Sequence, residues 1–221
     1  MYDFRELSIK IFILLVVYSI IYYYPKLNKY SDETKFNYYR SFMCLAFTII
    51  GLHILINHFS NGFSHPFSYH HYDMDEIHYI FMAYLIIDII KLLASKSTRY
   101  DLYGHHIISI LTILSGIFTN KFGYLHCIVL ICESISIVTG IDSIAIEDND
   151  NYLSYLCKKF RKNIINYIRL PIWLSIFIFS LKYLNRGPKM LIYPGLIFPF
   201  IMIFLDRYWE KKCDKVINKY E

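Results

Sequence analysis

The sequence predicts an all-α, multi-pass transmembrane helical bundle of about seven spans, with the N-terminus luminal or outside and the C-terminus cytosolic. Its composition is the first reason: 56% of the 221 residues are hydrophobic, and the mean hydropathy is +0.35. This is too apolar for an ordinary soluble domain. The second reason is that the apolar residues form runs long enough to cross a bilayer. The third is an unequal distribution of Lys and Arg between the loops.

The spans can be placed directly on the sequence. They are expected at 8–24, 41–58, 77–95, 100–119, 124–142, 164–184 and 190–208. The first ends in Tyr22-Tyr23-Tyr24-Pro25 without a small-residue cleavage site, which argues against a signal peptide. We therefore divide the chain into a first helix with a cytosolic loop (1–34), the main transmembrane domain (35–210) and a short basic tail (211–221).

The basic residues predict the orientation. With seven spans, only six of the 23 Lys and Arg residues fall on the side that holds the N-terminus. The other seventeen fall on the side of the C-terminus, which the positive-inside rule places in the cytosol. Because these residues flank the spans, we interpret them as topology signals and contacts to anionic lipid, and expect no nucleic-acid partner. No cysteine falls in a luminal loop, so no disulfide framework is expected.

Ionisable residues inside a span are costly and therefore candidates for function. Those expected at membrane depth are His53, Asp88, His105, His106, His126, Glu133 and Asp142. At about 1.5 Å per residue, His106, Glu133 and Asp88 lie roughly 20, 14 and 16 Å from the luminal edge. We expect these three to share one layer of the bundle. His126 lies seven residues before Glu133 and hence on the same helical face.

The pair His105-His106 suggests a reactive site. Neutral imidazole tolerates a low dielectric and acts as base, acid or nucleophile near neutral pH. A carboxylate such as Asp88 or Glu133 would fix its tautomer. Two structural alternatives to a reactive site remain. The histidines could reach the membrane interface from a helix end, and Asp88 could form a simple ion pair with Lys91.

The segment 58–78 holds five histidines and three acids and no Lys or Arg. This composition suits a metal site or a pH sensor, but the spacing matches no common motif. A solvated loop is the simpler interpretation, and no metal ligands are assigned.

Several motifs in order resemble the TLC-domain family of membrane proteins, which includes the ceramide synthases. Arg99-x-Asp101 followed by His105-His106 is similar to the family's signature. "AYLIIDII", with Tyr84 and Asp88, resembles its Tyr…Asp element. "CESIS", with Glu133 and Ser134, resembles the acidic-Ser element of the non-synthase branch, and "RLPIW", with Arg169, resembles an Arg-to-Pro element. The resemblance covers roughly residues 35–210.

Two departures limit the likeness to the synthases. The segment between Arg99-x-Asp101 and the His pair is shorter than usual. The synthase branch has a His-Asp element and a further Asp where this chain has Cys132-Glu133 and Ser136.

The resemblance implies a lipid-facing pocket in an integral membrane protein of the endoplasmic reticulum or another internal membrane, with membrane lipids as partners. It implies an acyl-CoA-dependent N-acyltransferase acting on a sphingoid-type amine. His105, His106, Asp88 and Glu133 would be catalytic. The candidate substrate-binding residues are Tyr84, Arg99, Asp101, His126, Ser134 and Arg169. Acyl-CoA would be a co-substrate, its phosphates near Lys96 and Arg99, and no bound cofactor is expected.

The alternative is a lipid-sensing, lipid-transport or trafficking protein that uses the same cavity without catalysis. A seven-span receptor or transporter is disfavoured, because the last span has no lysine for a retinal Schiff base and the third has no Asp-Arg-Tyr at its end. Homodimerisation stays open, since no clear Gly-x-x-x-Gly face is present.

Overall fold

The computed structural model describes residues 4–60, 72–119, 128–187 and 189–221, and these residues are helical with short turns and contain no strand. The chain starts with α1 (Phe4–Tyr22), the 3₁₀ turn η1 (Pro25–Leu27), α2 (Asp32–Ser60), α3 (Tyr72–Ala94) and α4 (Tyr100–Thr119). A helical stretch over 128–131 leads into η2 (Cys132–Ser136) and α6 (Thr139–Glu147). The last part comprises α7 (Asn151–Ile164), the π-helical turn η3 (Ile165–Arg169), α8 (Leu170–Lys182) and α9 (Lys189–Tyr220).

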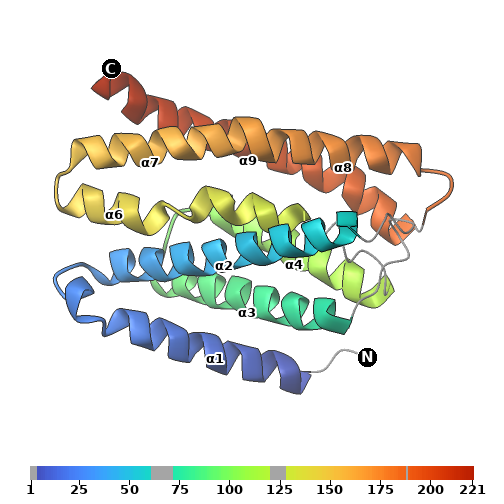
Figure 1. The fold of residues 1–221 in the computed structure, drawn as a ribbon, viewed down its shortest axis with the longest axis horizontal. Coiled ribbons are helices and arrows are strands. Elements are labelled where there is room, and N and C mark those ends of the chain that lie inside the picture. Colours follow the sequence, from blue (N-terminus) through green and yellow to red (C-terminus); the bar gives the residue numbers. More distant parts are fainter. Residues whose placement is uncertain (1–3, 61–71, 120–127, 188) are drawn as a thin grey trace.

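The helical rods run back and forth along one long axis, with α7 and α8 forming a single rod, and the two termini lie at opposite ends of the bundle (Figure 1). In the described residues, six helical segments are long and apolar enough to cross a membrane: Asp32–Asn57, Glu76–Ala94, Tyr100–Thr119, Ile128–Glu147, Asn151–Lys182 and Lys189–Tyr220. This supports a multi-pass membrane protein. The remaining predicted span is the first one in the chain, α1, which is 19 residues long but carries Arg5, Glu6 and Lys10 near its start. Its insertion and the orientation of the termini stay predictions.

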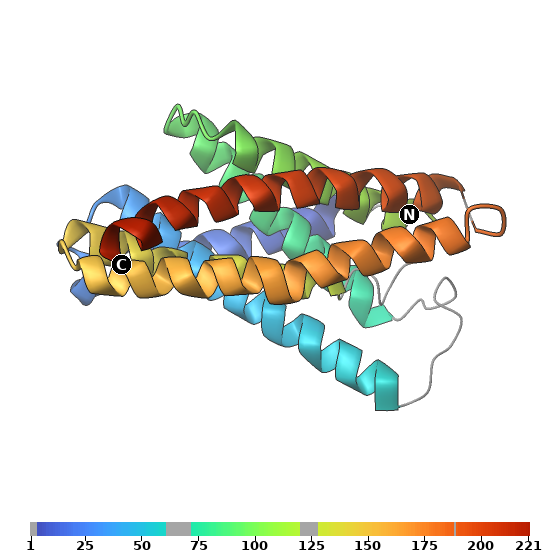
Figure 2. The same cartoon turned by 90° about the horizontal axis from the view of Figure 1, so that it is seen from above.

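Helix α7 begins well before the expected span. The polar stretch "IEDNDNYLSYLCKKFRKN" looks soluble in sequence, yet most of it is α7, which continues through η3 into α8. Helix α9 likewise continues through the expected tail to Tyr220. The two long helices run side by side (Figure 2), and the rings of Tyr155 and Tyr220 stack at 4.6 Å between centroids. Aromatic packing therefore extends the bundle beyond the apolar runs.

A polar clasp closes one end of the bundle. Tyr30 Oη donates to Asp148 Oδ2 at 2.7 Å, and Lys29 Nζ donates to Asp148 Oδ1 at 3.0 Å. These two donors hold the pKa of Asp148 below its usual value. Ser31 Oγ donates to Glu147 at 2.5 Å. The clasp joins the segment after η1 to the turn between α6 and α7.

Helices α2 and α6 approach closely at Gly140. A Cβ built there would lie 2.5 Å from the Cα of Tyr38, which is backbone and cannot rotate away. The Gly140 amide also donates to Ser41 Oγ at 2.7 Å. Since small residues let membrane helices approach, Gly140 sets how near α2 lies to the segment that carries Glu133.

We expect Gly140→Ala to destabilise the protein by about 1–3 kcal/mol, because the new methyl group must push two backbones apart. The measurement is unfolding of the purified protein in detergent micelles. Gly104→Ala is the matched control: it lies inside α4 with nothing within 4 Å of its Cβ position. That change should be neutral or stabilise by up to about 1 kcal/mol. Equal effects of the two changes would contradict the close contact.

Candidate functional site

The first polar cluster joins three helices around Asp88, whose side chain is fully buried. Arg40 of α2 binds it twice, with Nε 3.0 Å from Oδ2 and Nη2 2.5 Å from Oδ1. His106 of α4 approaches Asp88 Oδ2 through Nε2 at 2.9 Å. Because a carboxylate beside a guanidinium accepts only, His106 Nε2 is the donor. The arrangement is an Arg–Asp–His triad in which Asp88 and His106 are buried and Arg40 is partly exposed.

The partner of Asp88 is therefore Arg40 and not Lys91. Lys91 Nζ instead lies 5.7 Å from the centroid of the Phe36 ring. The simple Asp88–Lys91 pair considered above is wrong, because α2 starts nine residues before the expected span and brings Arg40 to the depth of Asp88.

The second cluster surrounds Glu133, at the start of the 3₁₀ segment η2. Its Oε1 lies 3.5 Å from His105 Nε2, and Cys44 Sγ donates to its Oε2 at 3.7 Å. Tyr84 Oη lies 3.5 Å from the same sulfur. All four side chains are buried. The adjacent histidines thus diverge, each toward a different carboxylate.

The third cluster contains Arg169 and Asp206, both fully buried. Arg169 Nε lies 2.9 and 3.1 Å from the two Asp206 oxygens. Trp173 Nε1 donates to the same carboxylate at 2.9 Å, and Arg169 Nη1 donates to the Cys132 carbonyl at 2.5 Å. These bonds connect α8, α9 and η2.

The local sequence explains the conformation at Arg169. Pro171 has no amide hydrogen, and its ring would clash with the carbonyl four residues earlier in a regular α-helix. The chain widens into the π turn Ile165–Arg169 directly before it. Such turns redirect side chains and are frequent at functional sites.

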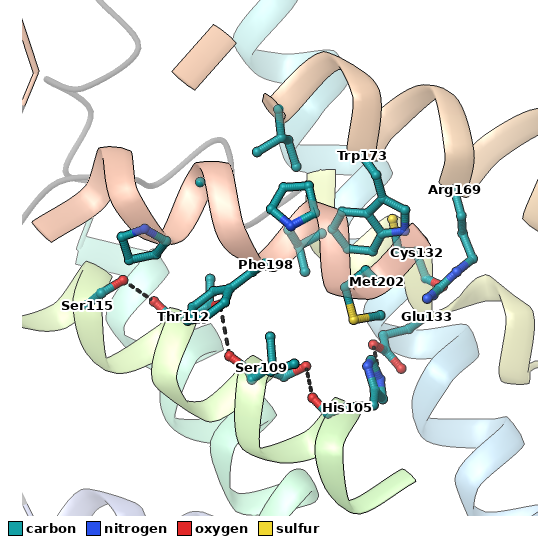
Figure 3. A pocket seen from close by; sticks show the side chains of 16 residues that line it. His105, Ser109, Thr112, Ser115, Cys132, Glu133, Arg169, Trp173, Phe198 and Met202 are labelled. Atoms are coloured by element: carbon teal, nitrogen blue, oxygen red, sulfur yellow. Dashed lines mark hydrogen bonds and ion pairs between the residues drawn. The ribbon is translucent and has the colours of Figure 1, made fainter. Parts of the chain in front are cut away.

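Two pockets meet at the second cluster. The apolar pocket lies between α4, α8 and α9 and encloses about 620 Å³, part of it open to the outside. Figure 3 shows it, with His105 and Glu133 close together at one end and Ser115 at the other. Its lining also includes the residues Ile108, Ser109, Thr112, Val129, Cys132, Arg169, Trp173, Ile176, Pro194, Gly195, Phe198, Pro199 and Met202.

The polar pocket lies beside both histidines and spans about 520 Å³, part of it open to the outside. It is lined by three arginines, both histidines and several other residues: Arg40, Arg99, Arg161, His105, His106, Tyr84, Leu102, Glu133, Ile135, Ser136, Thr139 and Trp209. Of the residues that the structure describes, only His105 and Glu133 line both pockets.

Of the other candidate residues, Arg99, Asp101 and Ser134 lie near the two histidines in the chain or beside Glu133. Arg99 binds Asp101 through two nitrogens at 2.8–3.3 Å at the edge of the polar pocket, and Asp101 also accepts from Trp209 Nε1 at 2.7 Å. Ser134 is buried beside Glu133. His126 and most of the His-rich segment lie outside the described residues. Among the residues that are described, no group of three or more His, Cys, Asp or Glu side chains could hold a metal ion.

Sequence reasoning missed two charged residues of these clusters, Arg40 and Asp206. In the sequence, Arg40 stands among the basic residues that flank a predicted span. Asp206 falls within the last predicted span, and an acid at that depth requires a partner. Arg169, in the sixth span, is the cation that supplies it.

Comparison with known proteins adds no assignment: no family model, no curated protein and no solved structure matches this chain. The two pockets and the residues between them are the features that bear on function.

We expect Arg40→Met to cost about 3–5 kcal/mol of folding stability, because it leaves Asp88 buried without its cation. Arg40→Met combined with Asp88→Asn should recover more than half of that loss, since the double change removes both charges. The measurement is unfolding in detergent micelles.

Lys29→Ala provides the surface control. It breaks an exposed ion pair with Asp148 and should cost less than about 1 kcal/mol. A loss for Arg40→Met no larger than this control would show that the triad does not hold the helices.

Proposed function

We propose that this chain is a TLC-type integral membrane protein that binds an acyl chain and transfers the acyl group from acyl-CoA to a lipid amine. One observation carries the proposal: His105 and Glu133 stand where an apolar pocket meets an arginine-lined polar pocket. An acyl-CoA is likewise apolar at one end, where it has a hydrocarbon chain, and anionic at the other, where it has its phosphate-bearing carrier.

The apolar pocket suits a hydrocarbon chain. From His105 to Ser115 it follows α4 for about 15 Å, at 1.5 Å per residue. Three hydroxyl groups face this stretch, but each donates to a carbonyl of its own helix: Ser109 to His105, Thr112 to Ile108 and Ser115 to Thr112, at 2.7–2.9 Å (Figure 3). Their hydrogen-bond donors are used, so the wall offers few unsatisfied polar groups to a ligand.

The polar pocket suits an anion. Arg40, Arg99 and Arg161 line it, and Arg161 Nε is buried with no hydrogen-bond partner among the described residues. Guanidinium groups bind phosphate through paired, charge-assisted hydrogen bonds. In this proposal the phosphates of the acyl-CoA lie here, and its thioester lies at His105.

His105 is the residue positioned to act as base. It would take a proton from the lipid amine as the C–N bond forms and return the proton to the thiolate released when the C–S bond breaks. Glu133 would orient the ring and stabilise the imidazolium. His106 lines only the polar pocket and donates to Asp88, so it would hold α4 in place.

The proposal includes the topology that the sequence predicts. Seven spans with a luminal N-terminus put the polar pocket toward the cytosol, where acyl-CoA is found, in the endoplasmic reticulum or another internal membrane. The basic loops of that end support this orientation.

One observation favours the second candidate, a lipid-binding protein without catalysis. The His105–Glu133 separation of 3.5 Å is longer than the roughly 2.6–3.2 Å of an orienting hydrogen bond. Such a protein would use the same apolar pocket and release its lipid unchanged.

The test is to incubate the purified protein with a long-chain acyl-CoA and a long-chain amine, and to follow amide formation by mass spectrometry. His105→Ala should lower the rate by at least about a hundredfold, which is the usual contribution of a general base. His53→Ala is the control, since His53 is exposed on α2 and should retain the rate. Unchanged turnover in His105→Ala contradicts the catalytic role. Bound lipid without product in the wild type selects the lipid-binding alternative.

A further inference from the structure

We infer that Arg169 supplies a hydrogen-bond donor to a neutral carbonyl oxygen of the ligand, at the polar end of the apolar pocket. The inference deepens the proposed function, on which it rests, because it selects ligands with an ester, amide or thioester group at the head of the chain.

The geometry of Arg169 leaves one nitrogen uncommitted. Nε is bound to Asp206, and Nη1 is bound to the Cys132 carbonyl. Nη2 is buried and has no hydrogen-bond partner among the described residues. A buried donor without an acceptor destabilises a protein, so a guanidinium held rigidly in this state is arranged for an acceptor from outside the chain.

The position of Arg169 in the fold places this residue at the pocket. Arg169 lines the apolar pocket together with His105 and Glu133. In Figure 3 its guanidinium reaches from the end of η3 toward Glu133, with His105 beyond it. An acyl chain lying along α4 would bring its first carbonyl to the same place, between Arg169 and His105.

The charges nearby select a neutral head. Arg169 and Asp206 already neutralise each other as a contact pair, and Glu133 adds a second buried carboxylate. A fatty-acid carboxylate would add a third negative group to this region, which is costly in a low dielectric. A carbonyl oxygen accepts the same hydrogen bond without adding charge.

The same contact would serve the reaction. As an amine attacks a thioester, negative charge develops on the carbonyl oxygen. A fixed donor aimed at that oxygen stabilises the charge as it forms. Arg169 would then be a catalytic residue beside the base His105.

The experiment measures binding, so that it does not depend on turnover. Brominated methyl octadecanoate and brominated octadecane share a chain length and differ by the ester. Each is titrated into the purified full-length protein in detergent micelles, and quenching of Trp173 fluorescence reports occupancy of the pocket. The chain has only two tryptophans, and Trp173→Phe identifies the signal of the pocket.

We expect the wild type to prefer the ester by about tenfold to a hundredfold, as a hydrogen bond from a charged donor provides. Arg169→Lys keeps a cation for Asp206 but has no equivalent of the Nη2 donor. This variant should lose the preference for the ester while still binding octadecane. Arg169→Met with Asp206→Leu removes the buried pair together and should lose it as well, which guards against misfolding of the single variant. Arg207→Lys, at a part-exposed arginine bound to Glu210, is the matched control and should retain it.

The outcomes separate the two proposals. If both chains quench Trp173 but the ester has no advantage, or Arg169→Lys retains the advantage, the role of Arg169 is wrong while the chain-binding pocket stands. If neither chain quenches Trp173, the proposed function fails, and the inference fails with it.

Discussion

The structure depends on the pairing of charges inside a bundle whose surroundings offer few other partners. Three buried acids each find a cation on another helix: Asp88 with Arg40, Asp206 with Arg169, and Asp142 with Lys158. Apolar contacts distinguish poorly between one helix orientation and another in lipid, because lipid tails are as apolar as the side chains. Leaving a charge unpaired is far more costly. The ion pairs therefore determine which faces of the helices meet.

The candidate site is a consequence of this pairing. Asp88 fixes the rotation of α4 through His106, and the preceding residue, His105, is thereby turned toward Glu133. Asp206 fixes Arg169, which in turn binds the carbonyl of Cys132, the residue before Glu133. Two structural ion pairs thus position both members of the His105–Glu133 pair. The Asp88–Arg40 pair holds His105 from one side, and the Asp206–Arg169 pair holds Glu133 from the other.

Part of this arrangement could be predicted from sequence. Long apolar runs located six helices that suit a membrane, and counting residues from the helix ends put Asp88, His106 and Glu133 at similar depths. Rotation about each helix axis could not be predicted, because spans such as 77–95 are apolar on nearly every face. Helix ends were underestimated wherever charged residues continue a helix, as at Arg40 and along α7. The 3₁₀ segment at Glu133 and the π turn at Arg169 lie outside regular periodicity, although Pro171 signals the latter.

The length of α7 and α8 has a consequence for how a ligand would reach the interior. Their continuous 32 residues extend about 48 Å, whereas the hydrocarbon core of a bilayer is about 30 Å thick. With Lys182 at one surface, the opposite surface falls about twenty residues earlier, close to Arg161. The arginine-lined pocket would then stand at the level of the lipid headgroups and the apolar pocket below it. An amphiphile could then enter laterally from that leaflet. Its polar head would stay hydrated and its chain would stay in the hydrocarbon core, so no polar group would have to cross the membrane.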